Sequence, residues 1–507
     1  MTHTPATVAQ LADIAGARVV GGSANTDQLS ITDVSLNSRD IEPGGLFAAL
    51  PGTRVHGAVY AADTPAAAIL TDDEGLAILQ SNDQAPERRP ILVVDNVRAI
   101  LGAVSAEVYG HPSKSLTILG VTGTSGKTTT SYLLERGLMA AGHTVGLIGT
   151  TGTRIDGNPV KTSLTTPEAT TLQKLFARMR DEEVTHVVME VSSHALMLGR
   201  VAGTEFAVGG FTNLSQDHLD FHPTMEDYFQ AKALLFDPAS PTAAKRAVVC
   251  VDDEWGVKMA GVAEDAVTVG TRGQQADLTA TLVDTDPTGG QDIKLAGLVN
   301  DQFHLPLPGA FNVANAALAV GMARAIDVDT HAFVEGLATV AVPGRMERID
   351  AGQKFLAVVD YAHKPAAVAA VLATLREQVD GRIGVVVGCG GDRDKTKRPI
   401  MGANAAKGAE LVIVTDDNPR SEDPAPIRAA VVAGAREAGT NAEIREVGSR
   451  TEAIDELVAW AQPGDAVVVV GKGHEVGQII GDQVIHFDDR EEVRRALADN
   501  GYEGATK

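Results

Sequence analysis

The segment 120–130 constrains the fold of this 507-residue chain more than any other part of it. It reads GVTGTSGKTTT, follows the apolar run Leu116–Val121 and precedes a helical pattern over 128–141. Glycine lets the backbone curl so that several amides point at one phosphate group, and the start of the helix adds partial positive charge. Lys127 can reach the outer phosphates of a nucleotide, and the Thr128 hydroxyl suits Mg²⁺. The pattern predicts a nucleotide-binding α/β domain.

The loop departs from the literal Walker pattern at one position. That pattern needs a glycine at 121, where this chain has Val121, and the glycines fall instead at 120, 123 and 126. An ordinary glycine-rich turn would explain the glycines, but not a Lys-Thr pair directly after the last of them. We therefore expect a nucleotide to contact these residues: Gly123, Thr124, Ser125, Gly126, Lys127, Thr128 and Thr129.

Strand and helix patterns alternate along most of the chain, which predicts parallel sheets covered by helices. Pro112–Ser115 has the composition of a linker, and Val342-Pro343-Gly344 that of a hinge. At roughly 150 residues per domain, the length indicates about three domains. We expect an α/β protein with these three domains: an N-terminal domain over 1–111, a central P-loop ATPase domain with a mostly parallel sheet over 112–342, and a C-terminal Rossmann-like domain over 343–507.

The charge of the chain narrows the choice of partners. Lysine and arginine number 43 against 66 aspartates and glutamates, a net charge of −23. Such a field repels phosphate backbones and anionic membrane surfaces, which argues against nucleic acid and membranes as partners. No apolar stretch approaches the ~20 residues of a membrane span, and residues 1–22 lack a signal-peptide pattern. Cys250 and Cys389 are far apart in sequence, which predicts reduced core thiols in a cytoplasmic protein.

Candidate metal ligands follow the nucleotide loop. Glu190 closes an apolar strand pattern and is expected at the carboxyl end of that strand, where open α/β sheets bind ligands; the alternative is a glutamate in solvent. His218 lies in the oxygen-rich segment 212–220 and is a second candidate, whereas we expect His222 to be structural. Lys232 is a single lysine in an apolar helical stretch, and its composition alone favours an ammonium group that reaches solvent.

Several longer motifs occur in order along the chain: Gly123-Thr-Ser-Gly-Lys-Thr-Thr-Thr130, Glu190-Val-Ser-Ser-His194, Asn213-Leu-Ser-Gln-Asp-His218, Lys232, Gly388-Cys-Gly-Gly-Asp-Arg-Asp-Lys395 and Gly471-Lys-Gly-His-Glu475. Over essentially its whole length the chain thereby resembles the ATP-dependent Mur ligases of peptidoglycan synthesis. The last two motifs are similar to those of the members that add the third residue of the stem peptide. Asp417-Asn-Pro-Arg420 matches the tetrapeptide of the form that adds meso-diaminopimelate, as opposed to lysine.

The resemblance implies an N-terminal domain that holds a uridine diphosphate, a central ATPase domain and a mobile C-terminal domain that binds the amino acid. It also implies that Lys232 is carbamylated by CO₂. An ordinary lysine has a pKa near 10.4 and would repel Mg²⁺, whereas its carbamate is an anionic oxygen ligand. This reverses the interpretation of Lys232 as a solvent-reaching lysine. The implied metal ligands are these residues: Thr128, Glu190, His218 and carbamylated Lys232.

The resemblance also implies substrate contacts, residue by residue. Ser38 matches the uridine-side motif. The muramoyl dipeptide is contacted in the family at positions that match Thr165, Thr166, Ser192 and Arg200. The adenosine side of the ATP site matches Asn315, Arg345 and Asp360, and His363 matches a residue near the domain junction. Leu198 stands where some relatives have a polar side chain, so among its neighbours Arg200 is the favoured sugar-diphosphate contact.

Selection of the amino acid has a simple physical basis, because diaminopimelate differs from lysine by one carboxylate at its far end. Arg420 can bind that carboxylate bidentately, with Asn418 as a further donor or acceptor. Asp417 and Glu475 suit the distal ammonium, and Arg393 suits the carboxylate nearer the reaction. The remaining predicted contact of the amino acid is Gly471. Taken alone, the segment 417–420 could equally be a proline-containing turn after a strand.

The activity so implied is ligation of meso-diaminopimelate to UDP-N-acetylmuramoyl-L-alanyl-D-glutamate through an acyl phosphate, with ATP converted to ADP and phosphate. Its catalytic residues are expected to be Lys127, Glu190, His218 and Lys232, with Mg²⁺ as cofactor. Three alternatives stay open: a lysine-adding ligase, a ligase similar to folylpolyglutamate synthase, and a non-catalytic scaffold that responds to nucleotide. The sequence does not determine the oligomeric state, and a monomer is favoured.

Overall fold

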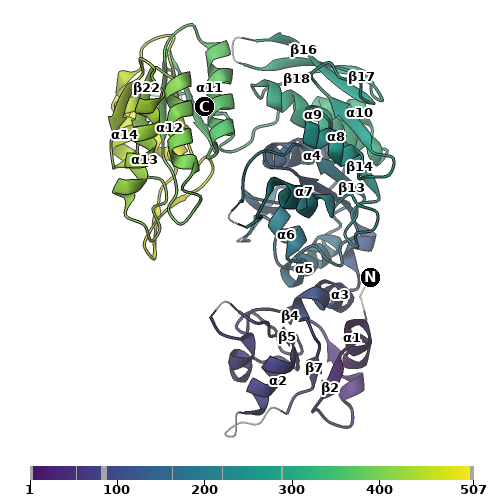
Figure 1. The fold of residues 1–507 in the computed structure, drawn as a ribbon. Helices are drawn as coiled ribbons and strands as arrows, with labels where there is room; N and C mark the ends of the chain where they lie inside the picture. The colour runs from purple at the N-terminus through teal and green to yellow at the C-terminus, as the bar shows by residue number, and fades with distance from the viewer. Residues whose placement is uncertain are drawn as a thin grey trace.

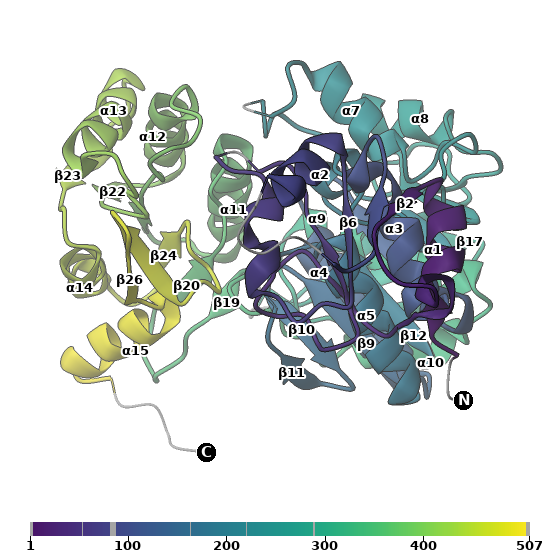
Figure 2. The ribbon, with the colours of Figure 1, turned by 90° about the horizontal axis from the view of Figure 1, so that it is seen from below.

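The computed structural model describes residues 4–52, 54–81, 88–162, 164–219, 221–286 and 289–502. It contains three α/β bodies in chain order (Figure 1). The N-terminal body and the C-terminal body both border the central one. Figures 1 and 2 agree that the C-terminal body lies beside the central body and apart from most of the N-terminal one, with α11 (Pro365–Gln378) on its inner side.

The N-terminal body is built on a five-stranded sheet of order β2-β7-β6-β5-β4, in which only the β2–β7 pair is antiparallel. Apolar clusters lie on both faces of this sheet. Its elements are β1 Ala6–Thr7, α1 Val8–Ala15, β2 Arg18–Val20, β3 Ser30–Ile31, β4 Val34–Ser35, β5 Leu46–Ala48, β6 Ala68–Thr71, α2 Asp73–Gln80, β7 Ile91–Val93 and α3 Val97–Val108. The short strands β1 and β3 form a separate antiparallel pair.

The central body contains an eleven-stranded sheet of order β11-β10-β9-β12-β8-β13-β14-β15-β16-β17-β18. The strands from β9 to β16 in this order are parallel, and the outer pairs at both edges are antiparallel. The strands are β8 Thr117–Thr122, β9 Val145–Gly149, β10 Gly152–Ile155, β11 Asn158–Val160, β12 His186–Glu190, β13 Val208–Phe211, β14 Arg246–Cys250, β15 Val267–Gly270, β16 Leu278–Thr285, β17 Gln291–Gly297 and β18 Asp301–Leu305.

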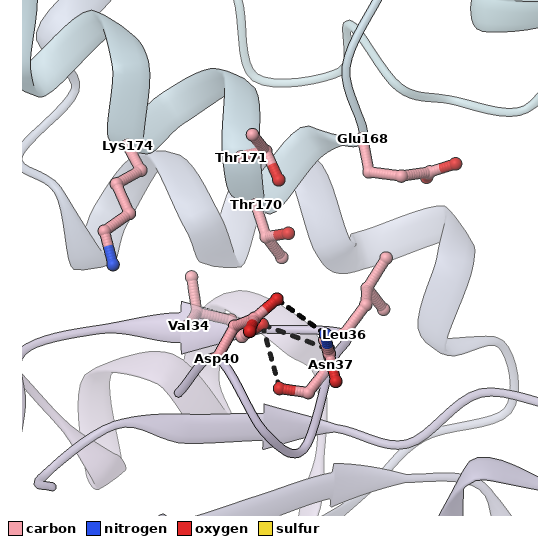
Figure 3. Close-up of a pocket in the computed structure, with 9 residues that line it drawn as sticks. Val34, Leu36, Asn37, Asp40, Glu168, Thr170, Thr171 and Lys174 are labelled. Carbon is pink, nitrogen blue, oxygen red and sulfur yellow. Dashed lines mark hydrogen bonds between the residues drawn. The ribbon is translucent and has the colours of Figure 1, made fainter. Parts of the chain in front are cut away.

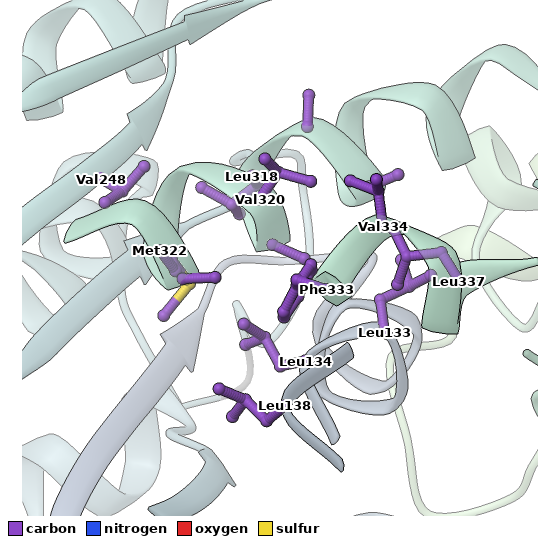
Figure 4. Close-up of a cluster of buried hydrophobic side chains, with 14 of the residues drawn as sticks. Leu133, Leu134, Leu138, Val248, Leu318, Val320, Met322, Phe333, Val334 and Leu337 are labelled. Atoms are coloured by element: carbon purple, nitrogen blue, oxygen red, sulfur yellow. The ribbon is translucent and has the colours of Figure 1, made fainter. Parts of the chain in front are cut away.

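Helices cover both faces of the central sheet. One face carries α4 (Lys127–Ala140), α9 (Ala310–Ala325) and α10 (Thr330–Leu337), whose side chains interdigitate in Figure 4. Gly137 of α4 lies against the Phe333 ring, and the absence of a β-carbon there permits this close contact. The other face is covered by α5 Ala169–Asp181, α6 Ser193–Met197, α7 Met225–Ala233 and α8 Glu254–Ala260.

The C-terminal body has a six-stranded sheet of order β19-β20-β24-β21-β22-β23, parallel except for the edge pair β19–β20. Its central strands are unbroken apolar runs because helices bury both of their faces. The elements are β19 Glu347–Arg348, β20 Leu356–Asp360, α11, β21 Ile383–Val387, α12 Lys397–Gly408, β22 Leu411–Val414, α13 Pro424–Glu437, β23 Glu443–Glu446, α14 Arg450–Trp460, β24 Ala466–Val470, the hairpin β25 Gly477–Ile480 with β26 Gln483–His486, and α15 Asp489–Asp499.

The predicted linker at Pro112–Ser115 is wrong in one respect, since the segment forms a 3₁₀ helix with Pro112 and Ser113 buried. The Ser113 hydroxyl accepts a hydrogen bond from the Glu205 amide, which ties the segment to the central body. At the predicted hinge, Gly344 has φ +61° and packs against Gly473, so a side chain would not fit there. Both cysteines are buried and unpaired, as expected. Within the described residues, no helix has the length and apolarity needed to cross a membrane.

Candidate active site

The nucleotide loop joins the carboxyl end of β8 to the start of α4. Gly123 and Gly126 have φ values of +143° and +89°, which side-chain-bearing residues rarely adopt. A β-carbon on Gly123 would collide with Thr212, and one on Gly126 would collide with Asn315. The loop is therefore held closely between the end of β13 and the start of α9. Asn315, expected on the adenosine side of the ATP site, lies against Gly126 of this loop.

Two lysines donate to carbonyl groups inside this loop. Lys127 Nζ lies 3.0 Å from both Gly123 O and Thr124 O, and Lys232 Nζ lies 2.9 Å from Gly123 O. The Ser125 amide donates to Asn213 Oδ1, which braces the turn from outside. Burial and the nearby Lys364 lower the pKa of Lys127 to about 8.

Glu190 lies at the end of β12 beside the loop and is only 1% exposed, so the alternative of a solvent-facing glutamate is wrong. Its Oε1 accepts from Thr128 Oγ1 at 3.0 Å and from the Thr150 amide at 2.9 Å, and Oε2 accepts from Thr150 Oγ1 at 3.0 Å. This carboxylate and the Thr128 hydroxyl, both predicted metal ligands, are thus in direct contact.

Lys232 is 1% exposed, so the solvent-reaching lysine that composition alone favoured is wrong. Its Nζ lies 4.5 Å from the centre of the Tyr228 ring. Burial, reinforced by the neighbouring Lys127 and Lys364, holds the pKa of Lys232 well below its usual value. This shift favours the uncharged amine, which is the form that can react with CO₂.

His218 follows β13 in a turn with φ +53°. The centre of its ring lies 6.0 Å from the centre of the Tyr228 ring, and Lys232 Nζ lies over the same Tyr228 ring. The His218 Nε2 is 3.1 Å from Asp217 Oδ2. In the described parts of the chain, no three His, Cys, Asp or Glu side chains converge as a metal site by themselves. The expected ligand set fits this finding, because two of its four members are a hydroxyl and a modified lysine. Asp220, at the end of the same segment, lies outside the described residues.

His222 is buried, and its Nε2 lies 2.9 Å from Ser193 Oγ. This is the packed, hydrogen-bonded environment that a structural histidine requires, and it agrees with the expectation for this residue.

The residues predicted to contact the dipeptide surround the other side of Glu190. Thr166 Oγ1 donates to the Glu190 carbonyl at 2.8 Å and accepts from the Ser192 amide at 3.2 Å. Thr165 Oγ1 lies 3.2 Å from Thr150 Oγ1, the group that also contacts the Glu190 carboxylate. The structure therefore brings Thr165, Thr166 and Ser192 together at the edge of the nucleotide site.

Arg200 connects this cluster to the N-terminal body. Its Nη1 donates to Thr166 O at 3.3 Å, and its Nε lies 2.8 Å from Glu168 Oε1, while Arg98 of α3 binds Oε2 of the same glutamate at 3.1 Å. Beyond it lies a cavity of about 180 Å³ between the turn after β4 and α5, shown in Figure 3. The cavity is lined by Val34, Ser35, Leu36, Asn37, Asp40, Glu168, Thr170, Thr171 and Lys174. Ser38 lies in the turn between two of these lining residues.

Arg345 of the C-terminal body was expected on the adenosine side and lies against the phosphate end of the loop in this structure. Its Nη2 donates to Thr128 Oγ1 at 3.1 Å, and its guanidinium stacks 4.1 Å from the Tyr361 ring centre. Asp360 is buried and accepts from the Met346 and Ala362 amides at 2.7 Å each, so it braces this junction. His363, expected near the domain junction, donates from Nδ1 to Tyr361 O at 2.9 Å.

The predicted amino-acid residues form a compact cluster at the carboxyl ends of β22 and β24. Asn418 Nδ2 donates to Glu475 Oε2 at 3.2 Å, and Lys472 Nζ donates to Asn418 Oδ1 at 2.8 Å while lying 3.6 Å from Asp417 Oδ1. Gly471 has φ +120°, and a β-carbon there would come within 2.7 Å of Asp417 Oδ2. The geometry therefore requires glycine at this position.

The two arginines of the cluster differ in how firmly they are held. Arg420 has φ +52°, its amide donates to Ile479 O at 3.0 Å, and its Nη1 donates to Gly391 O at 2.8 Å. Arg393 is exposed, and its Nη1 donates to the neighbouring Asp392 carbonyl at 3.2 Å. Arg420 is thus anchored between two loops, whereas Arg393 projects from the rim.

The sequence motifs pointed to most of these residues but missed three charged ones. Lys472 lies inside the motif 471–475 and is completely buried. Its position between two glycines, directly after an apolar strand, is the sequence pattern that could have identified it as a site residue. Asp217 and Lys364 form an ion pair of 2.7 Å between the central and C-terminal bodies, and each directly adjoins a predicted residue. No local pattern distinguishes these two from ordinary surface charges.

A continuous series of contacts runs through the site. It leads from Arg200 to Thr166, to Glu190, to Thr128 and to Arg345. From there it passes over the Tyr361 ring to His474, which lies 5.1 Å away and directly precedes Glu475 of the amino-acid cluster. The series therefore joins the central and C-terminal bodies at the phosphate loop, and the bonds of Arg98 and Arg200 to Glu168 connect it to the N-terminal body.

Comparison with known proteins gives a consistent result along the chain. Three family models match in succession: "Mur ligase family, catalytic domain" over 30–109, "Mur ligase middle domain" over 121–323, and "Mur ligase, glutamate ligase domain" over 344–473. The UDP-N-acetylmuramoyl-L-alanyl-D-glutamate--2,6-diaminopimelate ligase of Corynebacterium glutamicum is 63% identical over 480 residues, which cover 93% of this chain and 92% of that protein.

Two solved structures are also similar. One, of a UDP-N-acetylmuramoyl-L-alanyl-D-glutamate--2,6-diaminopimelate ligase, is 32% identical with a TM-score of 0.66 and covers 98% of this chain and 99% of its own. The other, Mycobacterium tuberculosis folylpolyglutamate synthase complexed with ADP, is 22% identical with a TM-score of 0.59 and covers 74% of this chain and 92% of its own. At that identity, the second likeness shows a shared fold alone.

Proposed function

The chain belongs to the Mur ligase family, and from this premise we propose that it joins meso-diaminopimelate to UDP-N-acetylmuramoyl-L-alanyl-D-glutamate with ATP as the energy source. It acts in the synthesis of the peptidoglycan precursor. The observation that carries the proposal is the contact series that joins the amino-acid cluster around Asn418 to the phosphate loop through Arg345. A ligase needs its amine donor and its phosphate site within one cleft, and this series supplies that proximity.

A carboxylate and an amine do not condense in water until the carboxylate acquires a leaving group. In the proposed reaction an oxygen of the D-glutamate side-chain carboxylate forms a bond to the γ-phosphorus of ATP. The bond from that phosphorus to the bridging oxygen breaks, and ADP departs with the electron pair. The product is an acyl phosphate, and the work of the protein in such transfers is largely positioning and electrostatic stabilisation.

The second step joins the amino acid. The uncharged amine of diaminopimelate attacks the acyl carbon, phosphate leaves with the electron pair of its carbon–oxygen bond, and the nitrogen releases a proton. The loop amides and Lys127 bind the phosphates. On the dipeptide side, Thr165, Thr166, Ser192 and Arg200 hold the carboxylate-bearing substrate against the loop.

The proposed cofactor is Mg²⁺, which would offset the negative charge of the phosphates and of the attacking carboxylate. The residues that would hold it are Thr128, Glu190, His218 and carbamylated Lys232. The contact between Thr128 and Glu190 and the burial of Lys232, which lowers the pKa of its amine, support this set. The carbamate removes the objection that a lysine ammonium group would repel a metal ion.

Selection of diaminopimelate is proposed to depend on the charges around Asn418. The anchored guanidinium of Arg420 would bind the distal carboxylate. Asp417 and Glu475 would accept the distal ammonium, and Arg393 at the rim would bind the carboxylate nearer the reaction. Lysine lacks the distal carboxylate and would leave Arg420 without its partner, which weakens its binding.

The domain limits 1–111, 112–342 and 343–507 are proposed as the units that bind the uridine diphosphate, ATP and the amino acid. The N-terminal cavity beside Ser38 supports the first assignment. The oligomeric state proposed is a monomer. Two unpaired buried cysteines and the use of ATP support a cytoplasmic location.

One experiment tests the proposal: phosphate release from ATP and the muramoyl dipeptide nucleotide, measured with meso-diaminopimelate and with L-lysine side by side. We expect turnover with diaminopimelate and much slower turnover with lysine. Equal rates, or a preference for lysine, would overturn the specificity. Absence of turnover with both amino acids would instead support the non-catalytic scaffold, and turnover with a folate substrate would support the folylpolyglutamate alternative.

A further inference from the structure

Lys364 reaches from the C-terminal body into the nucleotide loop of the central body. It stands directly before α11, and its side chain is only 12% exposed. Its Nζ lies 2.7 Å from Asp217 Oδ2 and donates to Thr124 O at 3.1 Å. A lysine that crosses between two domains to contact the backbone of a phosphate loop is not required by the packing of its own domain.

Thr124 O, the loop carbonyl that Lys364 contacts, also accepts from Lys127 Nζ at 3.0 Å. Two ammonium groups thus converge on one oxygen. Lys127 is the lysine expected to bind the outer phosphates of ATP. Because Lys364 shares its acceptor, it lies at the same end of the nucleotide site.

The charge around the loop favours an anion there. Lys127, Lys364 and Arg345 supply three cationic groups, and the carboxylates of Asp217 and Glu190 face them. Lys127 and Lys364 also use backbone carbonyls, which are weaker partners for an ammonium group than a phosphate oxygen is. Charge-assisted bonds to phosphate would replace these carbonyl contacts at a gain in free energy.

We propose that Lys364, a residue of the C-terminal domain, binds the terminal phosphate of ATP when the nucleotide occupies the loop of the central domain. In the structure it contacts Asp217 and Thr124. With ATP bound, its ammonium group leaves the Thr124 carbonyl and binds the γ-phosphate, and it stays on that group during transfer to the substrate carboxylate. The inference rests on the proposed function, because it requires ATP as the nucleotide.

Geometry points to the terminal phosphate rather than to the inner ones. The amides of the loop and of the first turn of α4 surround the inner phosphates in sites of this kind. A group that enters from another domain meets the end of the triphosphate that projects beyond the loop. ADP lacks that group, so Lys364 would contact ATP and scarcely contact ADP. This difference separates a phosphate ligand from a lysine that merely holds two domains together.

The test compares two nucleotides on Lys364→Met, which keeps the length of the side chain and removes its charge. Dissociation constants for Mg²⁺ with a β,γ-methylene analogue of ATP and for Mg²⁺ with ADP are measured by isothermal titration calorimetry on the full chain. We expect the analogue to bind about 10- to 100-fold more weakly than to the unmodified protein and ADP to change by less than about threefold. Lys364→Arg should recover part of the loss.

Lys407→Met is the matched control. Lys407 is an exposed residue of α12, and its replacement removes the same charge from the same domain. We expect both nucleotides to bind this variant as they bind the unmodified chain. Equal weakening of both nucleotides by Lys364→Met, or weakening of neither, would overturn the inference. Partial misfolding cannot imitate the expected result, because it lowers the bound fraction of both nucleotides alike.

The outcome distinguishes this inference from the proposed function. Suppose that the unmodified protein catalyses the reaction with diaminopimelate, and that Lys364→Met keeps the same ratio of affinities for the ATP analogue and ADP. The inference then fails and the proposed function stands. If the unmodified protein binds neither nucleotide in the presence of Mg²⁺, the proposed function fails and the inference fails with it.

Discussion

Lys472 Nζ donates a hydrogen bond to Asn418 Oδ1 over 2.8 Å, and neither side chain is open to solvent. The Ile479 amide donates to the same Oδ1 at 3.0 Å, so this oxygen has two donors. The amide group of Asn418 is thereby oriented, with Nδ2 toward Glu475. The sequence left open whether Asn418 acts as donor or acceptor toward the amino acid, and this arrangement makes it a donor.

Replacing Lys472 with methionine removes one of the two donors that orient Asn418, and it removes a buried positive charge beside Asp417 and Glu475. We expect the Michaelis constant for diaminopimelate to rise by about 10-fold or more, since a buried charge-assisted bond is lost. The constant for ATP should change by less than about twofold. Steady-state phosphate release with each substrate varied in turn measures both constants.

Lys354→Met provides the control for this variant, because Lys354 is an exposed lysine of the same domain. Its constants should equal those of the unmodified protein. A Lys472→Met variant with an unchanged constant for diaminopimelate would show that Asn418 is oriented without the lysine.

Arg420→Ala should act on the amino acid and not on the nucleotide. The guanidinium is held by Gly391 O at 2.8 Å and is placed to bind the carboxylate that distinguishes diaminopimelate from lysine. Loss of that bidentate contact should raise the Michaelis constant for diaminopimelate by about 10- to 100-fold and reduce the preference over lysine. The measurement is phosphate release with both amino acids, with Arg436→Ala, an exposed arginine of α13, as control. A change in the ATP constant instead would contradict the assignment.

Removing one partner of the buried ion pair between Arg450 and Asp489 should destabilise the C-terminal domain. Both side chains are 0% exposed, and the two bonds between them measure 2.7 Å each. Asp489→Asn leaves the guanidinium uncompensated in the interior, which should lower the free energy of unfolding by about 3–5 kcal/mol. Urea denaturation followed by circular dichroism measures the change.

The comparison for that variant is Asp499→Asn, at the exposed pair between Arg495 and Asp499. Exposed ion pairs contribute about 0–1 kcal/mol, so this variant should unfold close to the urea midpoint of the unmodified chain. Equal effects of the two substitutions would mean that burial does not govern the contribution of the 450–489 pair.

Stability should fall in acid partly because of His186 at the start of β12. Burial, together with the His143 ring 4.1 Å away, lowers the pKa of His186 to about 4. An unfolded histidine has a pKa near 6.5, so between pH 6.5 and 4 the unfolded chain binds more protons and is favoured as the pH falls. His186→Gln should flatten this part of the dependence of Tm on pH. A parallel decline in both proteins between pH 7 and pH 4.5 would exclude His186 as its source.

Much of the site could be predicted because its signals are local in sequence. The glycines of the loop, the Lys127–Thr128 pair after them and the strand ending at Glu190 each depend on the conformation of a few neighbouring residues. Parallel strands then carry their following residues to one edge of the sheet, so Glu190 and the 212–218 segment were expected beside the loop. Asn418 and Glu475 were expected together because the resemblance assigns both to the binding of the amino acid, and the structure places them at the carboxyl ends of β22 and β24.

By itself the sequence determined the family, the fold class and the residue types available for each step, because these follow from short motifs and from periodicity. Only the tertiary structure decided that Lys232 is buried, that Arg345 lies on Thr128 and that Lys364 contacts Thr124, 240 positions away in the chain. The physical reason is that desolvation and contact between domains depend on how separately folded bodies pack. A charged residue can have the same neighbours in sequence whether its side chain lies in water or contacts the phosphate loop of another domain.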